Sequence, residues 1–232
     1  MPSRARAPRS SDAYIWDLCA LLTGFIGATA LAAEVDTMNF VWVWFMPVIG
    51  LSASTAALVG NAIGAGHPQH ARRVLWTCVL LDCAVWATTA AIVYAARWPI
   101  AALLTSDPRI QALIAPCLAI YCLAGFADSA QNVMAGGLRG LGKQDFGAGV
   151  ILGCFWLVLL PLAALLVFAI PPPDGLDEHR LFGVWYSFFT GTSLAAAIFW
   201  LYIRRLDFGA VAEALQEDTP DEATAEYVAM RG

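Results

Sequence analysis

The stretch Ile110–Ala135, with the sequence IQALIAPCLAIYCLAGFADSAQNVMA, contains one charged residue, Asp128. A helix needs about 20 predominantly apolar residues to cross the hydrocarbon core of a bilayer, and this run is longer. A carboxylate is costly to place in hydrocarbon, so an acid at such a depth usually has a function. The stretch therefore predicts a membrane-spanning helix that carries a candidate functional residue.

The rest of the chain repeats this apolar character. A weaker run, residues 13–33, has Asp17 near its start. Only 13% of the 232 residues are charged, against about a quarter in soluble proteins. The sequence predicts an all-α polytopic membrane bundle of about six transmembrane helices, and its four remaining runs are residues 37–59, 74–96, 146–170 and 181–203.

Lys and Arg residues favour one side of this bundle. If the N-terminus is cytoplasmic, the outer connections hold only Arg97, Arg109 and Arg180. The N-terminal tail, the inner connections and the end of the last run then hold nine basic residues. By the positive-inside rule we expect a multi-pass protein of the plasma membrane or an organellar membrane, with both termini cytoplasmic. Its parts would be a basic N-terminal tail (residues 1–12), a transmembrane helical bundle (residues 13–206) and a cytoplasmic acidic tail (residues 207–232).

An alternative interpretation of the first run is a cleaved signal peptide. Arg4, Arg6 and Arg9 precede an apolar run that ends in Ala28-Thr29-Ala30, which has the spacing of a cleavage site. Its removal would leave five spans and place the termini on opposite sides of the membrane.

Asp128 has polar residues beside it at helical spacing. Gly125, Asp128, Asn132 and Ala135 share one helix face, and Gln131 lies next to them. A polar stripe on an apolar span faces protein or water rather than lipid. Asp128 is therefore the main candidate for binding substrate or a coupling ion, with Gln131 and Asn132 as candidate cavity-lining residues. The alternative is a buried acid that is hydrogen-bonded only for packing.

Four other acids and one asparagine need an interpretation. Asp17 lies near a helix start, where an acid also complements the helix dipole, so functional and structural roles both stay open. Asp82 lies in the middle of a span with apolar neighbours, and it is a candidate cavity-lining residue or a structural one. Glu34 and Asp36 are assigned to a solvated outer turn. Asn39, one turn further on, is expected to face the same cavity as the acids.

Proline and glycine residues suggest where the helices bend and approach one another. Pro47 and Pro161 fall in the middle of runs, where a proline frees a carbonyl and favours a kink. Kinked helices often line transporter cavities, so Pro47 is a candidate cavity-lining residue. Gly60 and Gly64 form a small-xxx-small pattern that permits close helix contact.

Several classes of function are disfavoured by the sequence. It contains no nucleophile elbow, phosphate-binding loop, zinc-protease motif or dinucleotide fingerprint. His67 and His70 are too few to suggest a metal site. No basic segment is large enough to suggest a nucleic-acid partner. We therefore expect no enzymatic activity, no metal and no cofactor.

Several separated motifs resemble the multidrug and toxic compound extrusion (MATE) family, in order from residue 14 to residue 206. GLSAS at 50–54 and VGNAIGAG at 59–66, followed by Ala71-Arg72, are similar to the eighth helix and its loop in that family. GGLRGLGKQ at 136–144, with Gly147-Ala148, is similar to the junction of the tenth and eleventh helices. Leu160-Pro161-Leu162 and Gly183-Val184-Trp185 fit the last two helices.

The resemblance implies an antiporter that exports organic cations in exchange for protons, or for sodium in some members. It places Asp17 and Asp128 where eukaryotic-type members carry glutamates of the seventh and tenth helices, which bind cationic substrate and the coupling ion. Asn39 falls where some relatives have a further acid, whereas Asp82 matches no such residue. Both acids are one methylene shorter than glutamate.

The family fold has two six-helix lobes with the transport cavity between them, and only the second lobe resembles this chain. The implied partners are an organic cation, the lipid bilayer and a second lobe from the same or another polypeptide. Two other hypotheses stay open: a non-transporting scaffold or half-transporter subunit that requires a partner lobe, and, less favoured, a membrane enzyme or a channel.

Overall fold

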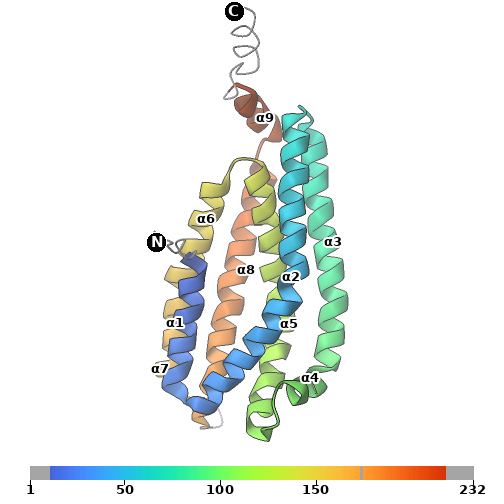
Figure 1. Cartoon of the computed structure of the whole chain (residues 1–232). Coiled ribbons are helices and arrows are strands. Elements are labelled where there is room, and N and C mark those ends of the chain that lie inside the picture. Colours follow the sequence, from blue (N-terminus) through green and yellow to red (C-terminus); the bar gives the residue numbers. More distant parts are fainter. Residues whose placement is uncertain (1–10, 173–174, 218–232) are drawn as a thin grey trace, which may run out of the picture.

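The computed structural model describes residues 11–172 and 175–217, and within these residues it contains helices and no strand (Figure 1). The α-helices follow one another with one π-helical segment, η1, and one 3-10 turn, η2. In chain order the elements are α1 (Ser11–Ile26), α2 (Ala28–Gly64), α3 (Pro68–Ala95), α4 (Arg97–Leu104), α5 (Pro108–Gly140), α6 (Gln144–Gly153), η1 (Cys154–Leu159), α7 (Leu160–Phe168), η2 (Asp177–Arg180), α8 (Leu181–Arg205) and α9 (Phe208–Glu217).

Five helical segments of the described residues are long and apolar enough to cross a membrane. They are α2, α3, α5, the continuous segment from Gln144 to Phe168, and the segment from Asp177 to Arg205. The apolar part of α1, Asp17–Ile26, is shorter. The predicted all-α membrane bundle is therefore confirmed, with five long spans and one short helix in place of six comparable spans.

Helix α5 occupies the centre of this bundle. It packs against α2, α3 and α8, which lie around it, while α1 and α7 form one edge and α3 the opposite edge (Figure 1). Its middle and C-terminal parts are mostly buried. Most residues on the inward faces of α5 are consequently covered by neighbouring helices, although Leu123 is exposed.

The turn between the first two helices lies at Gly27, whose φ of 152° is a conformation that favours glycine. Helix α2 begins immediately afterwards at Ala28. The prediction of an outer turn at Glu34 and Asp36 was therefore wrong, because the chain reverses about two helical turns earlier, at Gly27. Both acids belong to a continuous helix.

Helices α2 and α5 approach closely where α5 carries glycines. A methyl group built on Gly136 would lie 2.3 Å from the backbone oxygen of Ser52, and one built on Gly140 would lie 2.5 Å from that of Ala56. Gly60 faces Gly140 across the same contact, whereas Gly64 has no atom within 4 Å of such a methyl group. The expected close contact therefore involves Gly60 and the glycines of α5.

The two mid-span prolines lie in different settings. Helix α2 continues through Pro47 and changes direction along its length (Figure 1). Pro161 is the second residue of α7, which directly follows the π-helical segment η1. A π-helical turn is a common accommodation of a disturbed helical ladder.

The last described helix, α9, packs against α2 and α3. It buries Phe208, Val211 and Ala212. The packed part of the chain therefore extends beyond residue 206, into the region assigned to an acidic tail. The rest of that region, residues 218–232, and residues 1–10 of the N-terminal tail lie outside the described residues.

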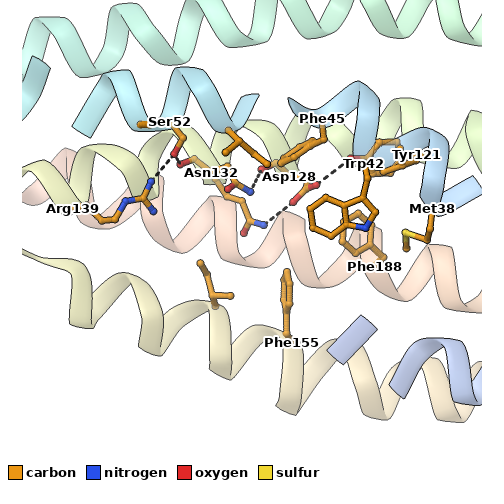
Figure 2. Close-up of a pocket in the computed structure, with 15 residues that line it drawn as sticks. Met38, Trp42, Phe45, Ser52, Tyr121, Asp128, Asn132, Arg139, Phe155 and Phe188 are labelled. Carbon is orange, nitrogen blue, oxygen red and sulfur yellow. Dashed lines mark hydrogen bonds between the residues drawn. The ribbon is translucent and has the colours of Figure 1, made fainter. Parts of the chain in front are cut away.

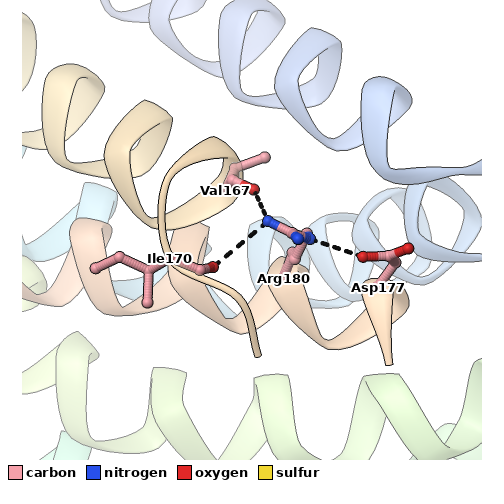
Figure 3. Close-up of polar contacts among 4 residues, drawn as sticks. All are labelled: Val167, Ile170, Asp177 and Arg180. Carbon is pink, nitrogen blue, oxygen red and sulfur yellow. Dashed lines mark hydrogen bonds and ion pairs between the residues drawn. The ribbon is translucent and has the colours of Figure 1, made fainter. Parts of the chain in front are cut away.

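Arg180 joins the end of α7 to the start of α8 (Figure 3). Its Nη1 donates to the backbone oxygens of Val167, at 2.5 Å, and Ile170, at 3.4 Å. Its Nε donates to Asp177 Oδ1 at 2.9 Å. A cation at a helix C-terminus satisfies carbonyls that lack helical partners, so Arg180 fixes this connection.

Candidate functional site

Asp128 lies in the middle of α5, where its side chain is held by two neighbours on the same helix. Tyr121 Oη donates to Asp128 Oδ2 at 3.3 Å, and Gln131 Nε2 donates to Asp128 Oδ1 at 3.0 Å. Asn132 Nδ2 donates to the backbone oxygen of Asp128 at 3.3 Å. The residue is 9% exposed. No Lys or Arg of the described chain forms an ion pair with it, so its partners are neutral donors.

The Asp128 cavity, as we call it, has a volume of about 370 Å³ (Figure 2). It lies between α2, α5, the segment that contains η1, and α8, and aromatic rings form much of its wall. Its lining consists of Met38, Val41, Trp42, Phe45, Ile49, Ser52, Ala53, Tyr121, Asp128, Gln131, Asn132, Arg139, Ile151, Phe155 and Phe188.

A polar contact between α2 and α5 closes one part of this cavity. Ser52 Oγ donates to the backbone oxygen of Asn132 at 2.5 Å and accepts from Arg139 Nη2 at 2.9 Å. Arg139 is eleven residues from Asp128 on the same helix, which is about 16 Å along the axis. The cavity therefore has its negative and positive side chains at separated positions, as Figure 2 shows.

This arrangement is suited to binding an organic cation. A buried carboxylate attracts positive charge, and aromatic faces attract it further through their quadrupoles. Apolar walls accommodate the hydrocarbon part of such a molecule. A volume of about 370 Å³ also lies within the range of small-molecule sites.

The predicted site residues do not all lie together. Gln131 and Asn132 line the Asp128 cavity. Asp17 is exposed and lines a separate groove at the edge of the bundle, together with Leu21, Gly24 and Phe25 of its own helix. Helix α1 is packed on α2 and α7, so the fold leaves Asp17 away from the α5 face that carries Asp128.

Asn39, which is expected to face the same cavity as the acids, does not line the Asp128 cavity of the described residues. Asn39 is exposed on α2 and is absent from the residues that line the Asp128 cavity, although Met38 and Trp42 line it. A rotation of about 100° separates consecutive residues on a helix, so Met38 and Asn39 cannot face the same direction.

Pro47 and Asp82 do line a cavity, but it is a different one. This second cavity, of about 240 Å³, lies between α2 and α3. Asp82 is 3% exposed, and its carboxyl lies near the hydroxyl of Ser129 on α5. The apolar neighbours of Asp82 in the sequence gave no sign of this polar contact, because it comes from another helix.

Glu34 is a buried acid that the sequence interpretation missed. It is 3% exposed, interacts with the Trp185 indole of α8, and its Oε2 has no hydrogen-bond partner within the described part of the chain. Ala30, Thr37 and Val41 are also buried and lie at helical spacing from Glu34. This helical spacing of residues 30, 34, 37 and 41 could have indicated from the sequence that Glu34 is buried. Recognising it depends on placing the turn before the helix at Gly27, rather than at Glu34.

His67 and His70 are exposed at the start of α3. Within the described residues, no group of three or more His, Cys, Asp or Glu side chains is arranged to hold a metal ion.

Long apolar helices around an internal cavity with a buried carboxylate define a multi-pass membrane protein with a candidate binding site inside its bundle. The family model described as MatE matches residues 18–165, which is more than half of the chain. The chain therefore belongs to the MATE family.

Related proteins and solved structures agree with this assignment. Multidrug and toxin extrusion protein 2 of Homo sapiens is 27% identical over 220 residues, which cover 94% of this chain and 35% of that protein. The probable multidrug resistance protein NorM of Caulobacter vibrioides is 32% identical over 188 residues, which cover 81% of this chain and 38% of that protein. The structure of the eukaryotic MATE transporter AtDTX14 matches with a TM-score of 0.76 at 23% identity, over 88% of this chain and 45% of that one.

A further structure, the MATE transporter ClbM in complex with Rb+, matches with a TM-score of 0.78 at 18% identity, over 90% of this chain and 46% of that chain. The chain thus spans less than half the length of these relatives.

Proposed function

We propose that this chain forms the cation-binding lobe of a secondary antiporter that exports organic cations in exchange for protons or sodium ions. The observation that carries the proposal is the carboxylate of Asp128 in a cavity walled by aromatic rings. The names of the relatives, multidrug and toxin extrusion proteins and multidrug resistance proteins, support the same substrate class.

Coupling follows from competition for a single carboxylate. An ionised Asp128 attracts an organic cation, whereas a protonated Asp128 has lost that attraction. Occupation of the same oxygens by a sodium ion would displace an organic cation in the same way. If the two occupants favour opposite-facing conformations, binding one of them on each side of the membrane drives exchange.

We also propose that transport requires a second lobe, from the same or another polypeptide. The observation that favours this is the coverage of the relatives, of which the chain spans less than half. In this proposal the chain by itself binds the cation, and the second lobe completes the pathway. If the chain bound no cation, a scaffold or regulatory subunit would be favoured instead.

Binding is the first test. Purified chain in lipid nanodiscs would be titrated with ethidium, a fluorescent organic cation, over a range of pH. We expect Asp128→Asn to lower the affinity about tenfold or more, because a contact to a charged group contributes about 1.5–3 kcal/mol. Acidification should weaken binding to the wild type and leave the residual binding of the variant unchanged.

The matched control is Glu213→Gln, which removes an exposed carboxylate on α9 and should leave the affinity unchanged. Equal affinities of the wild type and Asp128→Asn would remove Asp128 from the site. Efflux from vesicles, driven by a proton gradient or by a sodium gradient at constant pH, then identifies the coupling ion. Efflux would be measured with the chain alone and with a co-expressed first lobe of a relative.

A further inference from the structure

Helices α3 and α5 run antiparallel, and the register of their contact can be followed residue by residue. Trp86 of α3 covers Gly125 of α5 so closely that a methyl group on Gly125 would lie 1.8 Å from the indole ring. Trp86 Nε1 donates to the backbone oxygen of Cys122 at 3.1 Å. The Cys122 thiol in turn contacts the backbone oxygen of Ala90 at 3.5 Å.

One turn further along this contact, the register brings Asp82 of α3 to Ser129 of α5, because both helices advance by four residues. The two side chains lie near each other and are buried, with 3% of Asp82 and none of Ser129 exposed. Neither Asp82 Oδ2 nor Ser129 Oγ has a hydrogen-bond partner in the described part of the chain. A polar group buried in this way is costly unless a proton, a water or an ion completes it.

The second cavity gives Asp82 a place for such an occupant. It has a volume of about 240 Å³ and is walled by α2 and α3. Its lining is otherwise almost entirely apolar, and consists of Trp44, Pro47, Val48, Leu51, Leu81, Asp82, Val85, Trp86 and Thr89.

An aromatic cluster separates this second cavity from the Asp128 cavity. Trp44 stacks on Trp86 with ring centroids 4.5 Å apart, and Tyr121 packs edge-on against both at 5.7 Å. Trp44 and Trp86 line the second cavity, whereas Tyr121 lines the first and donates to Asp128. The two acids are therefore on opposite sides of one wall.

The two carboxyl groups are nevertheless connected through α5. Ser129, which lies near Asp82, follows Asp128 directly in the chain. The charge of Asp82 is also close enough to act on Asp128. The other titratable group that interacts with Asp82 is Cys83 on its own helix. The residues of α2 that line the second cavity include no titratable or charged side chain.

We propose that Asp82 is a second proton-binding site, which accepts a proton from water in the second cavity and is coupled to Asp128 across α5. The physical reason is that Asp82 is 3% exposed beside a cavity with almost entirely apolar walls. Leu81 and Val85, which flank this cavity, are exposed at the surface of the described bundle. No cation of the described residues pairs with Asp82. In hydrocarbon an unpaired carboxylate is costly, and a proton is the smallest occupant that neutralises it.

This inference deepens the proposed function, since it adds a second ionisable site behind the cation-binding one. Its test does not require transport. The full chain in nanodiscs would be titrated with acid while infrared spectroscopy follows the carbonyl stretch of protonated carboxyl groups. Asp82→Asn should remove one component of this signal and shift the midpoint of the Asp128 component by about one pH unit or more.

Reciprocity sharpens the test. Asp128→Asn should shift the midpoint of the Asp82 component by the same amount, because coupling between two binding events is equal in both directions. Ser129→Ala keeps both acids and should still change the Asp82 component. It serves as the second variant if Asp82→Asn does not fold. Glu213→Gln is the control and should shift neither component.

The inference is overturned if Asp82→Asn leaves the signal and the Asp128 midpoint unchanged. That result would not affect ethidium binding at Asp128, so the proposed function would stand. Conversely, a chain that shows the coupled titration but binds no ethidium would retain the second site and lose the proposed function.

Discussion

The centre of α5 and the start of α1 each carry an aspartate in an apolar helix, and the structure gives the two residues different surroundings. Asp128 is 9% exposed, receives hydrogen bonds from Tyr121 and Gln131, and faces a cavity walled by four elements. Asp17 is exposed in a groove lined by its own helix and Leu31 of α2.

The difference shows that the position of a helix in the bundle decides what an acid can do. Helix α5 is surrounded, so a polar group on it is shielded and its partners come from nearby donors. Helix α1 is at the edge, and its Asp17 is exposed there, whereas Thr23 of the same helix is buried. Equal charge in the sequence therefore does not imply equal function in this lobe.

The largest expected effect tests this difference directly. In the ethidium titration, Asp17→Asn should change the affinity of the chain less than about threefold, against the tenfold or larger loss expected for Asp128→Asn. The reason is that Asp17 does not line the Asp128 cavity. Equal losses for the two variants would mean that both acids contact one cation, and the contrast between the two regions would be broken.

The next effect concerns the packing that creates the centre of the bundle. Gly136→Ala places a methyl group 2.3 Å from the backbone oxygen of Ser52, so α2 and α5 must separate. We expect a loss of about 1–3 kcal/mol in the free energy of unfolding, measured by denaturant titration in detergent. Gly149→Ala is the matched control because it has no atom within 4 Å of the new methyl group.

In an exposed helical position such as residue 149, alanine replaces glycine with a gain of up to about 1 kcal/mol. A Gly136→Ala chain as stable as the wild type would show that α2 and α5 are free to move apart. The α2–α5 contact at the centre of the bundle would then be no more rigid than the packing of α1 at its edge.

A smaller effect is expected at Glu34, which is buried between the two regions. Glu34→Ala should lower the free energy of unfolding by about 0.5–3 kcal/mol, because it leaves a cavity beside Trp185. Asp36→Ala, two residues away and half-buried, should change it by less than about 0.5 kcal/mol. Thermal unfolding followed by tryptophan fluorescence measures both. Equal effects would place Glu34 in a solvated position, as the sequence had suggested.

The sequence predicted the positions of the long spans well, because about 20 apolar residues in a row have few alternatives to a membrane helix. It also predicted that Asp128, Gln131 and Asn132 share a face, since that depends only on the helical period. It failed at Glu34, because the start of α2 depends on the conformation of Gly27. When the turn is placed at residues 34–36 instead of at Gly27, Glu34 is wrongly assigned to solvent.

The sequence by itself determined the class of protein, the helices and the one acid surrounded by polar neighbours on its own helix. These follow from local composition and periodicity, which need no knowledge of distant residues. Only the tertiary structure decided that Asp82 meets Ser129, that Asp17 lies at the edge, and that aromatic rings from several helices wall the Asp128 cavity. Each of these depends on which helix faces which, and that is set by close contacts such as Gly136 against Ser52 rather than by the apolar pattern of any single span.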